Sequence, residues 1–192
     1  MRFAALILAV ALAATAAPVA QSVGHKQTMF EIEHELLRLP TYGVFDFLAF
    51  GVEKGQVTLS GYAYSGLKSQ AERAVKRVPG VDSVDNRIEN LPASQNDDQI
   101  RWATFYKIYT DSFLSRYSPG GPMAARYELL QSSRFPGLQP FGTYPIHIIV
   151  KNGRIMLMGV VDSEIDRRMA EIRAREIPGV FSVENELTVD NE

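Results

Sequence analysis

The 192-residue chain contains no cysteine and only three histidines. The absence of cysteine excludes a disulfide framework, a thiolate zinc site, an iron–sulfur cluster, a cysteine nucleophile and an acylated-cysteine lipoprotein anchor. Three histidines leave little for a histidine-rich metal cage. The formal charge is −2 and no block of five or six like charges occurs, so nucleic-acid binding is not expected. We expect neither a metal nor a small-molecule cofactor.

Motifs for catalysis are scarce as well, although the chain is 46% hydrophobic and has the composition of a globular protein. It has no Gly-rich phosphate loop and no Gly-x-Ser-x-Gly nucleophile elbow. Glu31 and His34 have the spacing of ligands in di-iron bundles, but such a site needs two of these motifs. We therefore predict that the protein is not an enzyme and that His34 is a surface residue.

The long apolar run of the chain lies at its N-terminus. Arg2 precedes an apolar stretch that ends near Ala14, and small residues follow as far as Ala20. This layout predicts a cleavable secretory signal peptide over residues 1–20. The alternative is an uncleaved anchor helix, because an uncharged stretch of about 18 residues is long enough to span a bilayer.

Two segments roughly 98 residues apart repeat one pattern. Each holds an alternating strand that ends in glycine, then a serine, a Pro-Gly pair and a Val-x-Asn segment. The first copy has Val57 to Gly61, Ser65, Pro79-Gly80 and Val84 to Asn86, and the second has Ile155 to Gly159, Ser163, Pro178-Gly179 and Val183 to Asn185. Gly61 and Gly159 are interpreted as sites of close backbone approach within a sheet, and Gly80 and Gly179 as helix stops.

Each copy predicts a β-hairpin, a serine-capped helix and a third strand. The hairpins are expected at 44–52 with 56–63 and at 146–151 with 154–161, the helices from Ser65 and Ser163, and the third strands at 83–89 and 182–189. Asn152-Gly153 is a strong type I′ turn signal.

A further helix is expected before each hairpin. Thr28 and Glu31 form a capping box that predicts a helix ending at Pro40. In the second copy, Asp97 or Asp98 should begin a helix that runs to about Tyr117.

The prediction is an α+β protein with two small αββαβ domains, each with helices packed on a short mixed sheet. Domain 1 is expected at 26–90 and domain 2 at 97–190, with a linker at 91–96. Domain 2 carries an inserted segment at about 118–144, rich in proline, glycine and aromatic residues, in which 123–131 could form a short helix.

The repeated pattern of Val-x-Leu-x-Gly, a capped helix and Pro-Gly-Val-x-x-Val-x-Asn resembles the BON domain of bacterial osmotically inducible and nodulation proteins. Two copies behind a signal peptide are similar to periplasmic tandem-BON proteins. The resemblance implies a non-enzymatic envelope protein, free in the periplasm because it lacks a lipoprotein cysteine, that binds anionic phospholipid or envelope proteins and serves envelope integrity or osmotic stress tolerance.

The first candidate lipid-binding surface is the helix after the first hairpin. It carries Lys68, Arg73, Lys76 and Arg77 opposite its apolar face, with Glu72 as its acid. Such a face suits lipid phosphates. The alternative is a solvated face on which Glu72 pairs with Lys76.

The second candidate is the helix that begins near Asp97, where aromatic residues share one face. The stripe consists of Trp102, Phe105, Tyr106, Tyr109, Phe113 and Tyr117, and Arg101 and Lys107 flank it. Trp and Tyr suit a membrane interface, so Arg101, Trp102, Lys107 and Tyr109 join the lipid-binding set. The alternative is that the stripe is the core face of domain 2.

The leading hypothesis is therefore a periplasmic module that binds anionic phospholipid. The alternative is a periplasmic chaperone or adaptor that binds protein partners through the aromatic-rich surface of domain 2. The two differ in their response to salt, because screening weakens a charged contact more than an apolar one.

Overall fold

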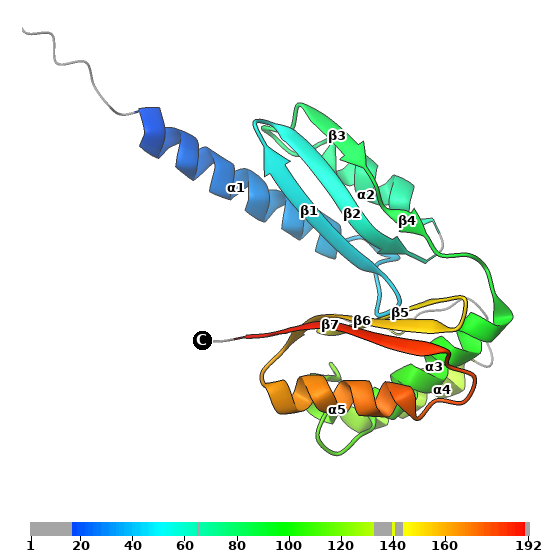
Figure 1. Cartoon of the computed structure of the whole chain (residues 1–192). Helices are drawn as coiled ribbons and strands as arrows, with labels where there is room; N and C mark the ends of the chain where they lie inside the picture. The colour runs from blue at the N-terminus through cyan, green and yellow to red at the C-terminus, as the bar shows by residue number, and fades with distance from the viewer. Residues whose placement is uncertain (1–16, 65, 133–139, 141–143, 191–192) are drawn as a thin grey trace, which may run out of the picture.

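A computed structural model describes residues 17–64, 66–132, 140 and 144–190. Within them, two αββαβ units follow one another, and each places helices on one face of a small mixed sheet (Figure 1). The predicted fold class is therefore confirmed. Residues 1–16 of the predicted signal peptide lie outside the described residues.

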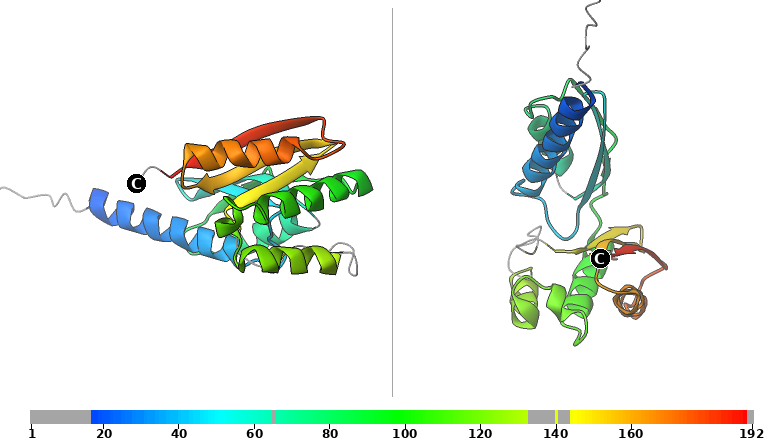
Figure 2. Two further views of the ribbon diagram at one scale, coloured as in Figure 1. Left: turned by 90° about the horizontal axis from the view of Figure 1, so that it is seen from below. Right: turned by 90° about the vertical axis from the view of Figure 1, so that its left-hand side faces the viewer.

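The first unit, here called domain 1, is built on a sheet with β2 at its centre. Its elements are α1 (Ala17–Leu37), β1 (Phe47–Glu53), β2 (Gln56–Ala63), α2 (Leu67–Val75), β3 (Ser83–Asn86) and β4 (Glu89–Asn90). Strand β1 pairs antiparallel with β2, whereas β3 and β4 pair parallel to it. Helices α1 and α2 cover one face of this sheet (Figure 2).

The second unit, domain 2, has the sheet order β5-β6-β7. Its elements are α3 (Gln95–Tyr109), the 3₁₀ helix η1 (Ser115–Tyr117), α4 (Gly121–Ser132), β5 (Ile146–Lys151), β6 (Arg154–Val161), α5 (Glu164–Arg175) and β7 (Ser182–Val189). Strand β5 pairs antiparallel and β7 parallel with β6. Helix α3 lies between α4 on one side and α5 on the other (Figure 2).

Both hairpins turn where the sequence predicts. Lys54 and Gly55 have φ of 48° and 80°, and Asn152 and Gly153 have φ of 53° and 72°. Two consecutive residues with positive φ define the type I′ turn, whose twist matches that of the flanking strands. The local turn chemistry therefore sets the register of both hairpins.

One asparagine in each repeat ties the third strand to the helix before it. The side-chain amide of Asn86 donates to the carbonyl of Lys68 and to Glu72, both at 3.0 Å. The equivalent Asn185 donates to the carbonyl of Arg167 at 2.8 Å and to Glu171 at 3.2 Å. The repeated asparagine is therefore a structural element of the αββαβ unit.

Two helix boundaries differ from the predictions. Helix α1 begins at Ala17, and Thr28 is not its cap, because the Thr28 hydroxyl donates to the carbonyl of Gly24 at 3.0 Å inside the helix. Pro18 does not prevent this early start, since proline is tolerated in the first turn of a helix.

Helix α3 begins at Gln95 and ends at Tyr109, eight residues before the predicted Tyr117. The Asp111 carboxylate accepts hydrogen bonds from the main-chain amides of Phe113 at 2.8 Å and Leu114 at 3.3 Å. An aspartate that bonds to the amides that follow it turns the chain out of the helix.

The serine caps are partly as predicted. The Ser163 hydroxyl accepts a hydrogen bond from the amide of Asp166 at 3.2 Å, which confirms this cap of α5. Ser65 lies outside the described residues, and Gly66 stands at the cap position of α2. The predicted strand 83–89 is divided into β3 and β4, because the Asn86 side chain accepts from the Ile88 amide at 3.2 Å.

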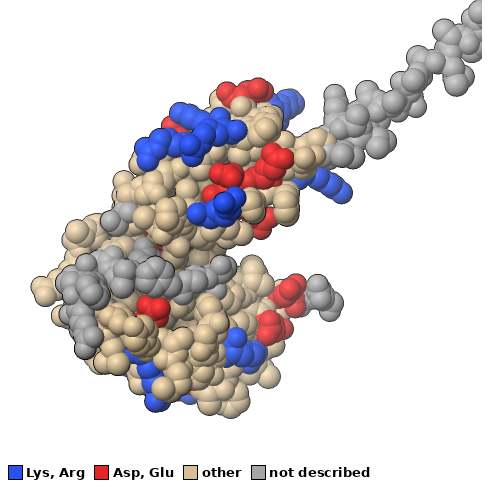
Figure 3. Space-filling view, turned by 180° about the vertical axis from the view of Figure 1, so that it is seen from behind, with Lys and Arg blue, Asp and Glu red and all other residues tan. Residues whose placement is uncertain are grey.

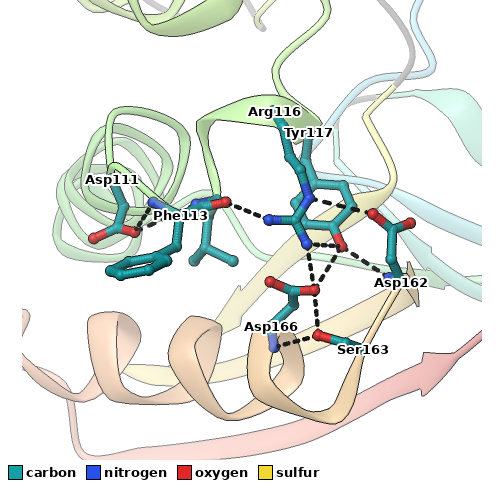
Figure 4. A network of polar contacts seen from close by, with 8 residues as sticks. Asp111, Phe113, Arg116, Tyr117, Asp162, Ser163 and Asp166 are labelled. Atoms are coloured by element: carbon teal, nitrogen blue, oxygen red, sulfur yellow. Dashed lines mark hydrogen bonds and ion pairs between the residues drawn. The ribbon is translucent and has the colours of Figure 1, made fainter.

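A polar cluster fixes the start of the inserted segment to the beginning of α5 (Figure 4). Arg116 pairs with Asp166 and, at 3.2 Å, with Asp162. The Tyr117 hydroxyl donates to Asp166 at 3.1 Å and accepts from the Asp162 amide at 2.8 Å. The main-chain carbonyl of Ser118 then accepts a hydrogen bond from the main-chain amide of Gly121 at 3.0 Å. Helix α4 therefore starts from an anchored turn.

Gly61 and Gly159 occupy equivalent places in the two hairpins. Their φ values are 110° and 118°. A Cβ at Gly61 would collide with the carbonyl oxygen of Phe47, and one at Gly159 with that of Pro145. These positions therefore require glycine both for their backbone conformation and for the close approach of the paired strand.

We expect Gly159→Val to lower the free energy of unfolding by roughly 2–4 kcal/mol, because a left-handed conformation and a main-chain clash combine. Gly61→Val should have the same effect in domain 1. Gly51→Ala is the matched control, since a Cβ at Gly51 meets nothing within 4 Å. Urea unfolding followed by circular dichroism measures the effect, and an unchanged midpoint in either valine variant would contradict this account.

Candidate functional site

Helix α2 separates apolar and cationic side chains onto opposite faces. Leu67, Ala71 and Val75 are buried against the sheet, because residues three or four apart share a helix face. Lys68 and Arg73 lie on the rest of the helix, and Lys76 and Arg77 lie in the turn that directly follows it. These four cations are here called the α2 basic face. Figure 3 shows Lys and Arg side chains on this side of domain 1, with Asp and Glu side chains among them.

The α2 basic face keeps a net positive charge after its ion pairs with acidic residues are counted. Lys76 pairs with Glu72 at 2.6 Å, as the alternative interpretation predicts. Hydrogen bonds from Lys76 and Asn86 lower the pKa of the Glu72 carboxyl. Within the described part of the chain, Arg73 and Arg77 have no acidic partner, and both are exposed.

The equivalent helix of domain 2 is different in this respect. The arginines of α5 are all paired: Arg167 and Arg168 with Glu164, Arg175 with Glu171, and Arg173 with Asp111 and Glu176. Hydrogen bonds from Arg167 and Arg168 lower the pKa of Glu164 to about 2. The arginines of α5 are therefore all neutralised by acids, whereas the α2 basic face presents two unpaired arginines to solvent.

A groove of about 400 Å³ runs between α1 and α2 beside the basic face. Phe30, His34, Ala74, Arg77 and Pro79 are among the residues that line it. The Phe30 side chain is 68% exposed and stacks on the His34 ring with centroids 6.3 Å apart. The groove thus has an exposed aromatic ring and the Arg77 guanidinium in its lining, together with the carboxylates of Glu31 and Glu35.

Sequence reasoning did not single out Phe30. The sequence pattern does indicate that Phe30 is exposed, because Phe30 lies off the helix face shared by Ile32 and Leu36. Those two residues are buried in the core of domain 1. An apolar residue off the core face of a helix is expected to be exposed. Met29, next to Phe30 in the chain, is 39% exposed.

The structure buries Arg101 and Tyr109. The Arg101 guanidinium donates to the carbonyl of Val150 at 2.5 Å, pairs with Asp98 and lies 4.8 Å from the centroid of the Tyr64 ring. The Tyr109 hydroxyl donates to the carbonyl of Ile146 at 2.6 Å, and burial raises the Tyr109 pKa. Both residues are interior and cannot contact a lipid surface directly.

The other two residues of α3 in the predicted lipid-binding set, Trp102 and Lys107, also have partners within the protein. Trp102 is half-buried and meets the Phe45 ring edge-on, with centroids 5.3 Å apart. Lys107 pairs with Glu176 at 2.7 Å. Because Phe105 and Tyr117 are buried in the same core, the aromatic stripe forms mainly the core face of domain 2.

The two domains share a core. Val44 and Phe45 precede β1, yet both are buried in the apolar cluster of domain 2. The amide of Ile148 in β5 donates to the carbonyl of Val44 at 2.8 Å. The neighbouring Asp46 is fully buried and accepts the amide of Tyr64 at 2.5 Å. This junction, formed by residues 43–47, fixes domain 1 to β5 and α3.

His147 is a buried titratable group at the junction. It lies in β5 on the face opposite Ile146 and Ile148, where Tyr42 stacks on its ring at 5.5 Å between centroids and Phe47 meets it edge-on at 5.6 Å. Its Nδ1 has no hydrogen-bond partner among the described residues. Burial lowers the pKa of His147 from 6.5 to about 4, although nearby main-chain carbonyls offset part of the shift.

The described residues do not bring three or more His, Asp or Glu side chains together in a way that could hold a metal ion. Their helices include none that is long and apolar enough to cross a membrane. The candidate site combines a cationic helix face, an adjoining groove and a buried junction between two repeated modules.

This architecture defines a class: a tandem of two small αββαβ modules. A model of the BON domain matches residues 51–92 and 133–191, which together make up just over half of the chain, so the protein belongs to the BON-domain family. BON domains occur in periplasmic and other envelope-associated proteins and are generally binding modules without catalytic activity.

Two solved structures are similar to this chain. One is of CdsD, a structural protein of the type III secretion system of Chlamydia trachomatis, with 19% identity over 86% of this chain and 94% of that chain and a TM-score of 0.27. The other is of the C-terminal domain of CdsD, with 18% identity over 84% and 96% of the two chains and a TM-score of 0.26. No curated protein matches the chain.

We expect the junction to weaken in acid. Because the folded-state pKa of His147 is about 4, the unfolded chain binds a proton at this residue between about pH 6.5 and pH 4 and the folded chain does not. Stability should therefore fall as pH decreases through this window, by about 3 kcal/mol from this residue.

The variant His147→Phe keeps the ring contacts and removes the titration, so it should show a smaller loss of stability between pH 7 and pH 4.5. Urea unfolding of both proteins at the two pH values is the measurement. Equal losses in the variant and the parent would show that His147 is not the group responsible.

Proposed function

We propose that this protein is a non-enzymatic module of the bacterial envelope that binds anionic phospholipid bilayers through the α2 basic face. The observation that supports this proposal is that Arg73 and Arg77 are exposed cations without an acidic partner in the described part of the chain. The proposed setting is the periplasm, and the proposed role is envelope integrity or stress tolerance.

The energetics favour a membrane surface as the partner of this face. Each Lys or Arg near an anionic leaflet contributes about 1 kcal/mol, and the contribution falls off within a Debye length. The two unpaired arginines of the α2 basic face, with Lys68 and Lys76 beside them, lose little intramolecular pairing when they bind lipid phosphate. The paired arginines of α5 would first have to give up their carboxylate partners.

The α1–α2 groove adds an apolar edge to the same surface. Phe30 is 68% exposed and lines the groove together with Arg77. An exposed aromatic ring and a guanidinium that line one groove suit the boundary between headgroups and acyl chains, where apolar and charged groups lie close together.

The chaperone or adaptor alternative has less support. It depended on the aromatic-rich surface of domain 2, but Phe105, Tyr109 and Tyr117 are buried. Phe113 and Tyr127 remain exposed, so a protein partner would have to be recognised through a smaller aromatic surface.

We expect Arg73→Gln with Arg77→Gln to weaken binding to vesicles of phosphatidylglycerol and phosphatidylcholine by about tenfold to thirtyfold, from two lost charges of about 1 kcal/mol each. Binding of the parent protein should also weaken at high salt and be absent with phosphatidylcholine alone. Co-sedimentation of the protein with the vesicles measures the affinity.

The matched control is Arg168→Gln with Arg175→Gln, which changes the net charge equally but removes arginines that are already paired on α5. This control should bind like the parent. If both double variants weaken binding equally, overall charge and not the α2 basic face is responsible. If the parent does not bind anionic vesicles at all, the proposed function is wrong.

A further inference from the structure

Helix α4 carries an exposed apolar stripe. Met123, Tyr127 and Leu130 are 72%, 60% and 69% exposed, whereas Ala125 is fully buried. At 100° per residue the three exposed side chains fall within about 60° of one another, opposite Ala125. Because Ala125 belongs to the core of domain 2, the stripe points directly away from the domain. We call these three residues the α4 stripe.

The α4 stripe and the α2 basic face lie on the same side of the molecule. In Figure 1 both helices lie behind the other elements of their domains, and in the right-hand view of Figure 2 both are on the left side. Helix α5 lies on the opposite side of domain 2 in that view. Each surface also faces outward, since the opposite face of its helix is buried.

The junction between the domains keeps these two surfaces in one orientation. Phe45 from domain 1 is buried in the core of domain 2, and Arg101 from domain 2 lies over the Tyr64 ring of domain 1. The turn before α4 is tied to α5 through Arg116 and Tyr117. A partner that contacts α2 therefore meets α4 at a defined position.

We infer that the α4 stripe inserts into the interfacial layer of an anionic bilayer, as the apolar contact that accompanies the α2 basic face. This inference rests on the proposed function. A bilayer is the partner that fits, because it is extended enough to reach both domains and offers negative charge to α2 and apolar depth to α4. Arg126, exposed on α4 beside the stripe, adds a cation for the same headgroup layer.

The first test is a matched pair of double variants in the full chain. Met123→Ser with Leu130→Ser removes two members of the stripe, and Ile165→Ser with Ile172→Ser removes two exposed side chains of α5 at the same seven-residue spacing. Affinity is measured with phosphatidylglycerol–phosphatidylcholine vesicles. The α4 variant should bind at least about tenfold more weakly, since two apolar side chains no longer leave water, and the α5 variant should bind like the parent.

A second test measures insertion directly. The chain has one tryptophan, so Trp102→Phe provides a background in which Tyr127→Trp reports on α4 and Ile165→Trp on α5. The indole on α4 should shift to shorter wavelength with vesicles and be quenched by brominated lipid, whereas the indole on α5 should do neither. Circular dichroism melts establish that each variant is folded.

The outcomes separate this inference from the proposed function. If the Arg73 and Arg77 variant weakens binding while the α4 serine variant binds like the parent and the α4 indole stays in water, insertion of the α4 stripe is wrong and the proposed function stands. If the α5 serine variant loses as much affinity as the α4 variant, the inference is also wrong. If the parent does not bind anionic vesicles, both are wrong.

Discussion

The packing of Phe45 into domain 2 is the contact on which the arrangement of this protein depends. Phe45 lies just before β1 of domain 1, yet its ring meets Trp102 at 5.3 Å and Phe105 at 6.3 Å between centroids. Edge-to-face aromatic pairs of this kind add to the stabilisation from burial. Because the two domains share this core, their surfaces are held together as one unit, and helices α2 and α4 remain on the same side.

The two repeats keep the same scaffold and differ on their surfaces. Each uses a glycine for close strand approach, a type I′ turn and an asparagine that bonds its helix to its third strand. The helices that follow the two hairpins differ in how their arginines are paired. Glu164 and Glu171 neutralise arginines on α5, whereas Arg73 on α2 has no acidic partner among the described residues. The proposed binding surface thus depends on the cations that are left without an acidic partner.

Sequence patterns predicted the local features well, and only some of the boundaries. Lys54-Gly55, Asn152-Gly153 and the Ser163 cap are settled by bonds within a few residues, so their conformations follow from the residues themselves. The end of α3 was placed too late, because the aromatic periodicity continues to Tyr117 while Asp111 turns the backbone earlier. The start of α1 was placed too late because Thr28 has the spacing of a cap but bonds back into the helix.

The sequence by itself determined the αββαβ repeat, its turns and the cationic character of α2, since periodicity, glycine and charge act over short distances along the chain. The tertiary structure decided which candidate residues reach solvent. Arg101 was expected to flank the aromatic stripe, and the stripe with Tyr109 could belong to a membrane interface or to the core; both residues are buried where α3 meets β5 and the residues before β1. Burial depends on elements distant in sequence, and a single helix pattern does not contain that information.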